Sequence, residues 1–151
     1  MKTAAQQKGF TLIELLVVIG ILAILFSIVL IAINPSRQFN QANDTKRRSD
    51  TIQILNAIHE YAAENSGSLP TNMPAKGHAA VDIANTGADI CAALVTKYIS
   101  ALPADPGTNA GAPVTVCTGA YTTGYQVAVD ADGRVTISAP NAALGTVAVT
   151  R

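Results

Sequence analysis

The chain has 151 residues, of which 49% are hydrophobic and only 13% are charged, and its formal net charge is zero. This length suits one modest domain, and the high apolar share makes a membrane-spanning segment the first feature to look for. The zero net charge argues against a general electrostatic affinity for nucleic acid, which needs a clustered basic surface, so DNA is not an expected partner.

The first predicted element is a helix over residues 10–33, a run of 24 residues that contains a single charge, Glu14. At about 1.5 Å per residue this helix is roughly 36 Å long, enough to cross a hydrocarbon core of about 30 Å. The run is too long for a secretory signal peptide and lacks a good small-residue cleavage site after it. We therefore interpret it as a transmembrane helix. Lys2 and Lys8 precede it, which predicts an N-terminus in the cytoplasm.

A second helical segment is predicted over residues 34–65. Pro35 removes one backbone donor and disfavours helix at the residue before it, so we expect a kink or local break there. Beyond this point apolar residues recur at spacings of three and four, which indicates an amphipathic helix. The predicted apolar stripe contains Phe39, Ala42, Ile52, Leu55, Ile58 and Ala62, and the predicted solvent-facing residues are Asp44, Lys46, Arg47, Asp50, Gln53, Glu60 and Glu64.

Residues 66–151 are expected to form a small extracytoplasmic α+β head. A short helix is predicted over residues 88–99, and Asp130–Gly133 is typical of a hairpin turn. The head needs a cover for one face of its small antiparallel sheet, and the amphipathic half of the long bent helix offers one. Alternating apolar residues predict strands around Val114–Val116, Tyr125–Val129, Val135–Ile137 and Gly145–Thr150.

The two cysteines, Cys91 and Cys117, both fall in the part that is predicted to lie outside the cytoplasm. An even number of cysteines in an oxidising compartment permits a disulfide. Such a cross-link would contribute roughly 3–4 kcal/mol in the chain-entropy model. The alternative is a pair of unpaired cysteines in a small core.

The stretch KGFTLIELLVV, Lys8 to Val18, resembles the start of the type IV pilin and type II secretion pseudopilin family. Glycine, then phenylalanine, then glutamate four residues on rarely coincide at a membrane-helix start behind a short basic leader. The resemblance implies a pilin-like α+β fold. It also implies that a prepilin peptidase removes residues 1–9 by cutting between Gly9 and Phe10, and that the new amine of Phe10 is methylated.

The resemblance further implies a structural subunit and not an enzyme. The precursor would be a single-pass protein of the cytoplasmic membrane, in contact with lipid, that assembles as a homo-oligomer into a helical filament at the cell surface or in the periplasm. An assembly ATPase and membrane platform proteins would be partners, and no cofactor is implied. The alternative is a membrane-anchored ligand-binding module or a minor pilin, which binds DNA or a surface and does not form the filament body.

Assembly roles are expected for Phe10, Glu14, Gly20 and Pro35. Cleavage turns the amide nitrogen of Phe10 into an amine that is mostly cationic at neutral pH, and methylation keeps that charge. The family implies that this amine pairs with Glu14 of a neighbouring copy, which would fix the register of the two helices. The alternative for Glu14 is a lone carboxylate that reaches the cytoplasmic interface. Gly20 lies on one side of the helix with Ala23 and Ser27, where small residues favour close helix packing, although ordinary scatter of small residues would look the same.

Other patterns predict no site of their own. HEYAAE, His59 to Glu64, lacks the second histidine of a zinc-protease helix, and His78 has no evident ligand set with it. Asp105, Asp130 and Asp132 could form a calcium site if they came together, but a plain turn is the favoured interpretation of the segment around Asp130 and Asp132. The basic run Lys46–Arg48 suits a solvated helix face or filament salt bridges better than DNA. No metal site and no catalytic constellation is therefore predicted.

Overall fold

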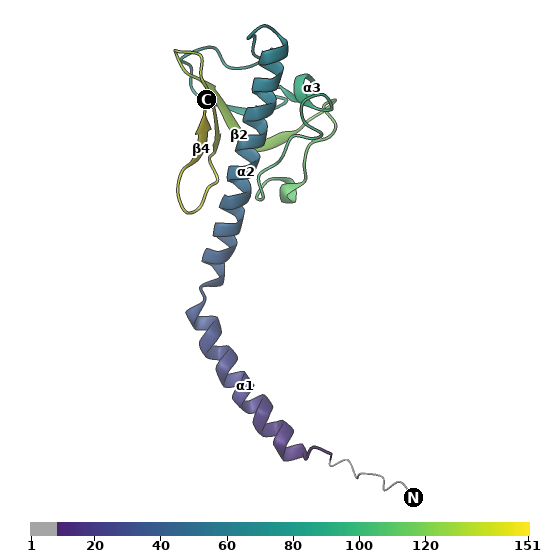
Figure 1. Cartoon of the computed structure of the whole chain (residues 1–151), viewed down its shortest axis with the longest axis vertical. Helices are drawn as coiled ribbons and strands as arrows, with labels where there is room; N and C mark the ends of the chain where they lie inside the picture. The colour runs from purple at the N-terminus through teal and green to yellow at the C-terminus, as the bar shows by residue number, and fades with distance from the viewer. Residues whose placement is uncertain (1–8) are drawn as a thin grey trace, which may run out of the picture. The chain divides into compact units, whose positions relative to one another are not determined.

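The computed structural model describes residues 9–151, and its helical segment is interrupted where Pro35 predicts a break (Figure 1). Helix α1 spans Leu12–Ala32 and helix α2 spans Pro35–Glu64. The backbone leaves helical geometry at Ile33, and Asn34 Oδ1 accepts a hydrogen bond from the N–H of Arg37 in the first turn of α2. The chain divides into two compact units, of which the first ends at Gln38 and the second begins at Phe39. The predicted leader lies outside the described residues except for Gly9.

Helix α1 is apolar on every side, and none of its 21 residues is buried. By length and composition it is the one helix among residues 9–151 that is able to cross a membrane. A soluble surface helix would carry a polar face towards water. Helix α1 has no such face, so it requires lipid or other protein around it.

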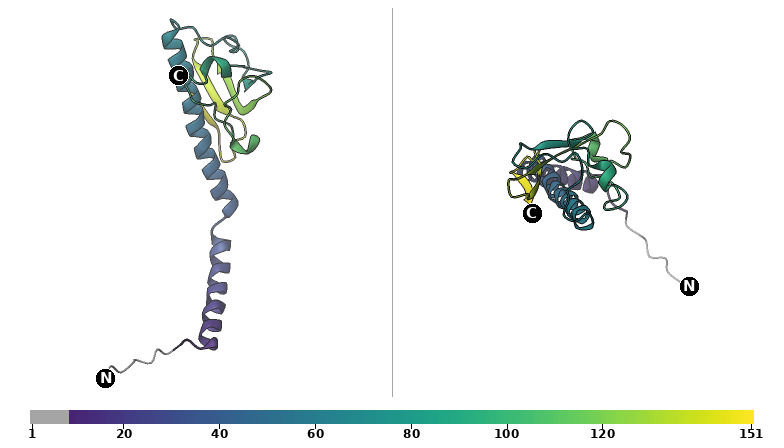
Figure 2. Two further views of the ribbon diagram at one scale, coloured as in Figure 1. Left: turned by 90° about the vertical axis from the view of Figure 1, so that its right-hand side faces the viewer. Right: turned by 90° about the horizontal axis from the view of Figure 1, so that it is seen from above.

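Helix α2 packs along one face of a four-stranded antiparallel sheet, as Figure 2 shows. The strands pair in the order β1-β2-β3-β4, which is also their order along the chain. Ile54, Leu55 and Ile58 of the helix form one core with the inward side chains of the strands. The α+β fold expected from the sequence is therefore confirmed. The strands are β1 (Val81–Ala84), β2 (Thr122–Val129), β3 (Val135–Ala139) and β4 (Val147–Thr150).

The predicted orientation of α2 is wrong for part of its length. Leu55 and Ile58 are buried as expected, but Phe39 is 70% exposed and Ile52 is 45% exposed. Three residues predicted to face solvent are buried instead: Asp44, Arg47 and Asp50. The physical reason is that these charged groups have partners within the head, as described below. The helix therefore turns their side, and not the side of Ile52, towards the head.

Two elements of the head also differ from expectation. The helix predicted over 88–99 is only one turn, α3 (Cys91–Leu94), because Val95 is extended and Thr96 has a φ of 73°. Val95 and Thr96 are β-branched, which weakens helix formation at this point. Val114 makes only an isolated bridge to Leu102, and Val116 is exposed, so the strand predicted there is absent. A 3₁₀ turn, η1, spans Asn109–Gly111.

The sequence does not predict strand β1, because its four residues are too few to show an alternating pattern. In the structure its pairing with β2 is irregular between Asp82 and Ala84. The hairpin turn at Asp130–Gly133 is confirmed, since Gly133 N–H donates to the carbonyl of Asp130. A disulfide joins Cys91 to Cys117, with 5.4 Å between their Cα atoms. It ties α3 to the irregular segment that precedes β2.

Gly124 in β2 lies where the strand approaches the loop that carries Asp105. A Cβ atom built on Gly124 would lie 2.5 Å from Thr108 Oγ1 and 2.8 Å from Asp105 Cβ, and the φ of Gly124 is +76°. Only glycine combines this backbone conformation with so close an approach.

We predict that Gly124→Ala destabilises the head by about 2–4 kcal/mol, because the methyl group both strains the backbone and displaces the Asp105 loop. Thermal unfolding of the full chain in detergent, followed by circular dichroism, measures the change. Gly119→Ala is the control, since Gly119 also has a positive φ but has open space around it. Equal losses in the two variants would show that the close approach contributes nothing.

Candidate functional site

The start of α1 holds Glu14 in a capping box with Thr11. Thr11 is the N-cap residue, and its hydroxyl accepts a hydrogen bond from the N–H of Glu14. The Glu14 carboxylate in turn accepts from the N–H of Thr11 at 2.8 Å and from its hydroxyl at 2.7 Å. The carboxylate that the sequence leaves without a counter-charge therefore has hydrogen-bond donors from its own chain. The T-x-x-E pattern is the sequence signal for this cap, and the cap was not among the sequence-based predictions.

Gly9 and Phe10 precede the capped helix and have no regular secondary structure. Because the helix begins at Leu12, the peptide bond between Gly9 and Phe10 lies outside its hydrogen-bonded turns. A Cβ on Gly9 would meet nothing within 4 Å. Nothing in the described structure therefore demands glycine at this position.

Three small residues of α1, Gly20, Ala23 and Ser27, lie on one side of the helix, at spacings of three and four. A Cβ added to Gly20 would meet nothing within 4 Å, so the helix backbone is open to close approach there. Ser27 donates its hydroxyl hydrogen to the carbonyl of Ala23 at 2.9 Å, which satisfies this side-chain donor without water. Such a face suits contact with another helix in lipid.

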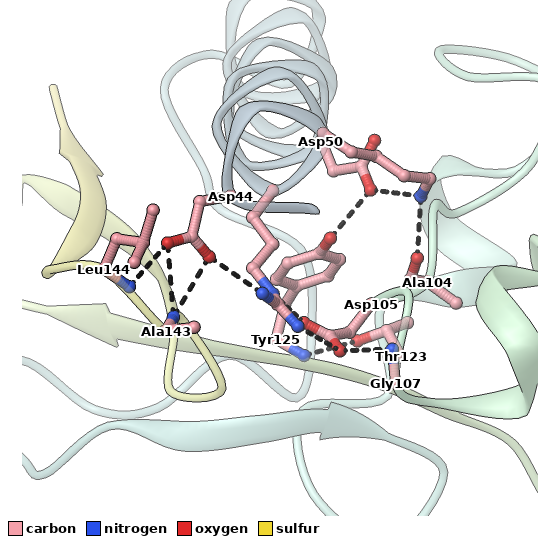
Figure 3. A network of polar contacts seen from close by, with 11 residues as sticks. Asp44, Asp50, Ala104, Asp105, Gly107, Thr123, Tyr125, Ala143 and Leu144 are labelled. Carbon is pink, nitrogen blue, oxygen red and sulfur yellow. Dashed lines mark hydrogen bonds and ion pairs between the residues drawn. The ribbon is translucent and has the colours of Figure 1, made fainter. Parts of the chain in front are cut away.

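A second polar site fastens the head to α2, and we call it the polar clamp (Figure 3). Arg47 is its centre: its guanidinium donates to Asp105 through Nε at 2.6 Å and Nη2 at 3.1 Å, and to Asp44 through Nη1 at 2.8 Å. The side chains of Arg47 and Asp105 are 6% and 0% exposed. One cation thus faces two carboxylates in a buried setting, so removal of Arg47 would leave both of them without a counter-charge.

The second half of the polar clamp surrounds Asp50. Its carboxylate accepts from the hydroxyl of Tyr125 at 2.7 Å and from Lys46 at 2.6 Å. Lys46 also donates to the carbonyl of Ala104 at 2.9 Å. Strand β2 and the loop before it are thus hydrogen-bonded to successive turns of α2.

Two loops are tied down by the carboxylates of the polar clamp. The N–H groups of Ala143 and Leu144, in the loop between β3 and β4, both donate to Asp44, with the shortest distance at 2.8 Å. The N–H of Gly107 donates to Asp105 at 2.8 Å. These bonds satisfy backbone donors of irregular segments that have no sheet partner.

The polar clamp sets the charge state of its acids. Burial alone would raise the pKa of Asp44, but hydrogen bonds from Leu144 N–H, Arg47 and Ala143 N–H outweigh it, so the pKa lies below its usual value. Burial also opposes ionisation of Asp105, and Arg47 with Gly107 N–H again lowers the pKa overall. Burial and the hydrogen bond to the charged Asp50 raise the pKa of Tyr125, which therefore stays a hydrogen-bond donor.

The acidic residues considered as calcium ligands do not lie together in one site. Asp105 is in the polar clamp, whereas Asp130 accepts from the N–H and Nε of Arg134 beside the hairpin turn. Within residues 9–151 no group of three or more histidine, cysteine or acidic residues is arranged to hold a metal ion. His78 contacts the carbonyl of Lys76 through Nδ1, and His59 lies on α2 with an unpartnered Nε2.

The polar clamp was not predicted as a buried site. The sequence predicts Asp44, Lys46, Arg47 and Asp50 on a solvated face because charged residues are rarely buried, and of these four only Lys46 is exposed. The spacing of Asp44 and Arg47, three residues apart on a helix, was a usable signal for an ion pair. The partner Asp105 lies 58 residues further on, and only the fold brings it to Arg47.

Comparisons with known proteins match the N-terminal segment and, for one relative, a longer stretch of 110 residues. The model of the family described as "Prokaryotic N-terminal methylation motif" matches residues 5–30. The chain is 33% identical over 110 residues to "Type II secretion system core protein G" of Escherichia coli (strain K12), which covers 72% of this chain and 72% of that protein. No solved structure gives a significant match.

We predict that Arg47→Ala destabilises the head by about 3–5 kcal/mol, because it leaves two buried carboxylates without a cation. Arg47→Lys is expected to recover only part of the loss, since an ammonium cannot make the forked contact with Asp105. Arg134→Ala is the control: its pair with Asp130 is exposed and should contribute only about 0–1 kcal/mol. Thermal unfolding of the full chain in detergent compares the three, and similar losses for Arg47→Ala and Arg134→Ala would contradict the role of the clamp.

The lowered pKa values of Asp44 and Asp105 predict acid sensitivity. Their stabilising contribution is fully present above the unfolded-state pKa of about 4 and is lost as the pH falls through the folded-state values. Asp105→Asn should be less stable than the native chain at pH 7 and should lose less further stability on acidification. Unfolding followed by circular dichroism between pH 7 and pH 2 tests this, and parallel pH curves for both proteins would refute it.

Proposed function

We propose that this chain, which belongs to the type IV pilin and type II secretion pseudopilin family, is the pseudopilin that forms the body of a type II secretion filament. The chain is a filament subunit of the pilin and pseudopilin type. The finer assignment is supported by the similarity to a secretion-system core protein, which extends over 72% of both chains and so well beyond the N-terminal motif.

The observation that carries the proposal is the exposure of all of α1, most of which lies within the methylation motif at residues 5–30. A helix that is apolar all round is stable only in lipid or inside a protein bundle. An inner-membrane anchor satisfies it first, with residues 10–33 spanning the membrane and the N-terminus in the cytoplasm. A bundle of copies satisfies it next, with the head of residues 66–151 and the second helical segment, 34–65, outside the membrane.

Processing prepares the chain for the transfer of α1 from the lipid into a bundle of copies. A prepilin peptidase removes residues 1–9 and the amine of Phe10 is methylated. Among the residues that the structure describes, it is Thr11 that donates hydrogen bonds to Glu14 in the precursor, and both donors are uncharged. The new cation at Phe10 of a neighbouring copy is a stronger partner for the same carboxylate, because a charge pair in a low-dielectric bundle is attracted more strongly than in water.

The pair would also select one register between neighbouring helices. Apolar helices slide past one another at little cost, whereas a slipped pair would leave one charge of each sign unpaired in the bundle. Gly20, with Ala23 and Ser27, would let two backbones approach, and the break at Pro35 would separate the packed segment from α2. An assembly ATPase and membrane platform proteins would extract the subunits from the lipid.

We predict that the native chain, expressed with a type II secretion machinery, yields sedimentable filaments whose subunit begins at Phe10 and carries one added methyl group. Mass spectrometry of the purified filaments measures both features. Gly9→Leu should leave the full-length precursor in the membrane, because a large side chain blocks entry of the backbone into a tight peptidase cleft.

Gly20→Leu separates processing from assembly. It should be cleaved and methylated like the native chain but should form fewer filaments, since a bulky side chain prevents close helix approach. A native chain that is cleaved but never sediments as a filament would favour an anchored binding module, and cleavage of Gly9→Leu at the native rate would remove the proposed role of Gly9.

A further inference from the structure

The loop between β3 and β4 presents an apolar side chain from a fixed backbone. Leu144 is 51% exposed, yet its N–H donates to the buried carboxylate of Asp44 at 2.8 Å. The preceding N–H, from Ala143, donates to the same carboxylate. A loop held in this way loses little conformational entropy when its side chain is covered, which is the property of a preorganised contact.

A hollow of about 180 Å³ lies beside Leu144, between the loop and α2. Arg48 of α2 lines it together with Gln41 and Thr45. Arg48 is exposed, and among residues 9–151 its guanidinium has no ion-pair or hydrogen-bond partner. Its neighbours Lys46 and Arg47 are both engaged in the polar clamp. The surface of Leu144 and Arg48 is therefore an apolar contact beside an unneutralised cation.

Glu60 is the complementary group on the same helix. It is exposed, and its carboxylate likewise has no ion-pair or hydrogen-bond partner in the described part of the chain. Glu60 and Arg48 are twelve residues apart on α2, which places them about 18 Å from one another along the helix axis. They cannot pair within one chain, but they can pair between two chains that are displaced along their helices.

We propose that the surface formed by Leu144 and Arg48 docks a second copy of this chain, through the face of α2 that carries Glu60 of that copy. The contact is heterologous: one patch of each copy meets a different patch of the next, and repetition of such a contact builds a filament instead of a closed dimer. It rests on the proposed function, and it adds to the α1 contacts a second contact that lies in the head.

Charge reversal tests the contact. Arg48→Glu and Glu60→Arg, each expressed alone with the secretion machinery, place like charges against one another, and each should reduce the yield of sedimentable filaments by about tenfold or more. The double variant Arg48→Glu/Glu60→Arg restores opposite charges at every contact and should recover most of the native yield.

Co-expression of the two single variants is the sharper measurement. In an alternating filament, the glutamate introduced at position 48 of one variant faces the arginine introduced at position 60 of the other. The native Arg48 of the second variant then faces the native Glu60 of the first, so the mixture should yield more filaments than either variant alone. A folding defect cannot be rescued in this way. Each variant should also keep the native membrane level and the methylated N-terminus at Phe10.

Lys76→Glu is the matched control, because Lys76 is an exposed cation of the head that lies outside the proposed contact. Leu144→Asp should reduce the filament yield as Arg48→Glu does, whereas Val116→Asp, at another exposed apolar position, should not. The proposal is overturned if the single reversals assemble like the native chain, or if neither the double variant nor the co-expressed mixture exceeds the singles. Failure of the native chain itself to form filaments would instead refute the proposed function.

Discussion

An apolar helix that contains one carboxylate dominates the behaviour of this protein. Every residue of α1 is exposed in the single chain, so its side chains need surroundings other than water. Lipid satisfies the apolar side chains, and the cap from Thr11 satisfies Glu14 while the chain is alone. A bundle of copies would satisfy the same groups and would add a charge pair that lipid cannot supply. Membrane anchoring and filament assembly are thus two solutions to one constraint.

The polar clamp solves a different problem, the placement of a small sheet on a long helix. Apolar contacts alone would permit several rotations and shifts of α2 against β2 and β3. Arg47 of α2 donates to Asp105, which lies 58 residues further along the chain, and this contact favours one position of the helix against the head. Buried ion pairs contribute little net stability, but an arrangement that separated Arg47 from Asp105 would leave buried charges unpaired, which is costly. The same carboxylate, Asp44, also orders the loop that presents Leu144.

The sequence predicts the parts of the protein that depend on local pattern. Length and apolarity predict α1, Pro35 predicts the break before α2, and alternation predicts β2 and β3. The burial of Arg47 was not predictable in this way, because its partner Asp105 is distant in sequence. Strand β1 and the single turn α3 are too short for a periodic signal. The capping box is readable from Thr11 and Glu14 alone, through the T-x-x-E pattern. It is not among the predictions because Glu14 is considered there only as a partner for a neighbouring copy or as a lone carboxylate.

The most direct test is a cryo-electron microscopy structure of the assembled filament at a resolution that shows side chains. We expect the α1 helices to pack together in the filament core, with the carboxylate of Glu14 within about 4 Å, the usual limit of an ion pair, of the methylated amine of Phe10 in a neighbouring copy. A filament in which Glu14 contacts only its own Thr11, or in which the α1 helices do not touch, would contradict the role given to cleavage and to the buried charge.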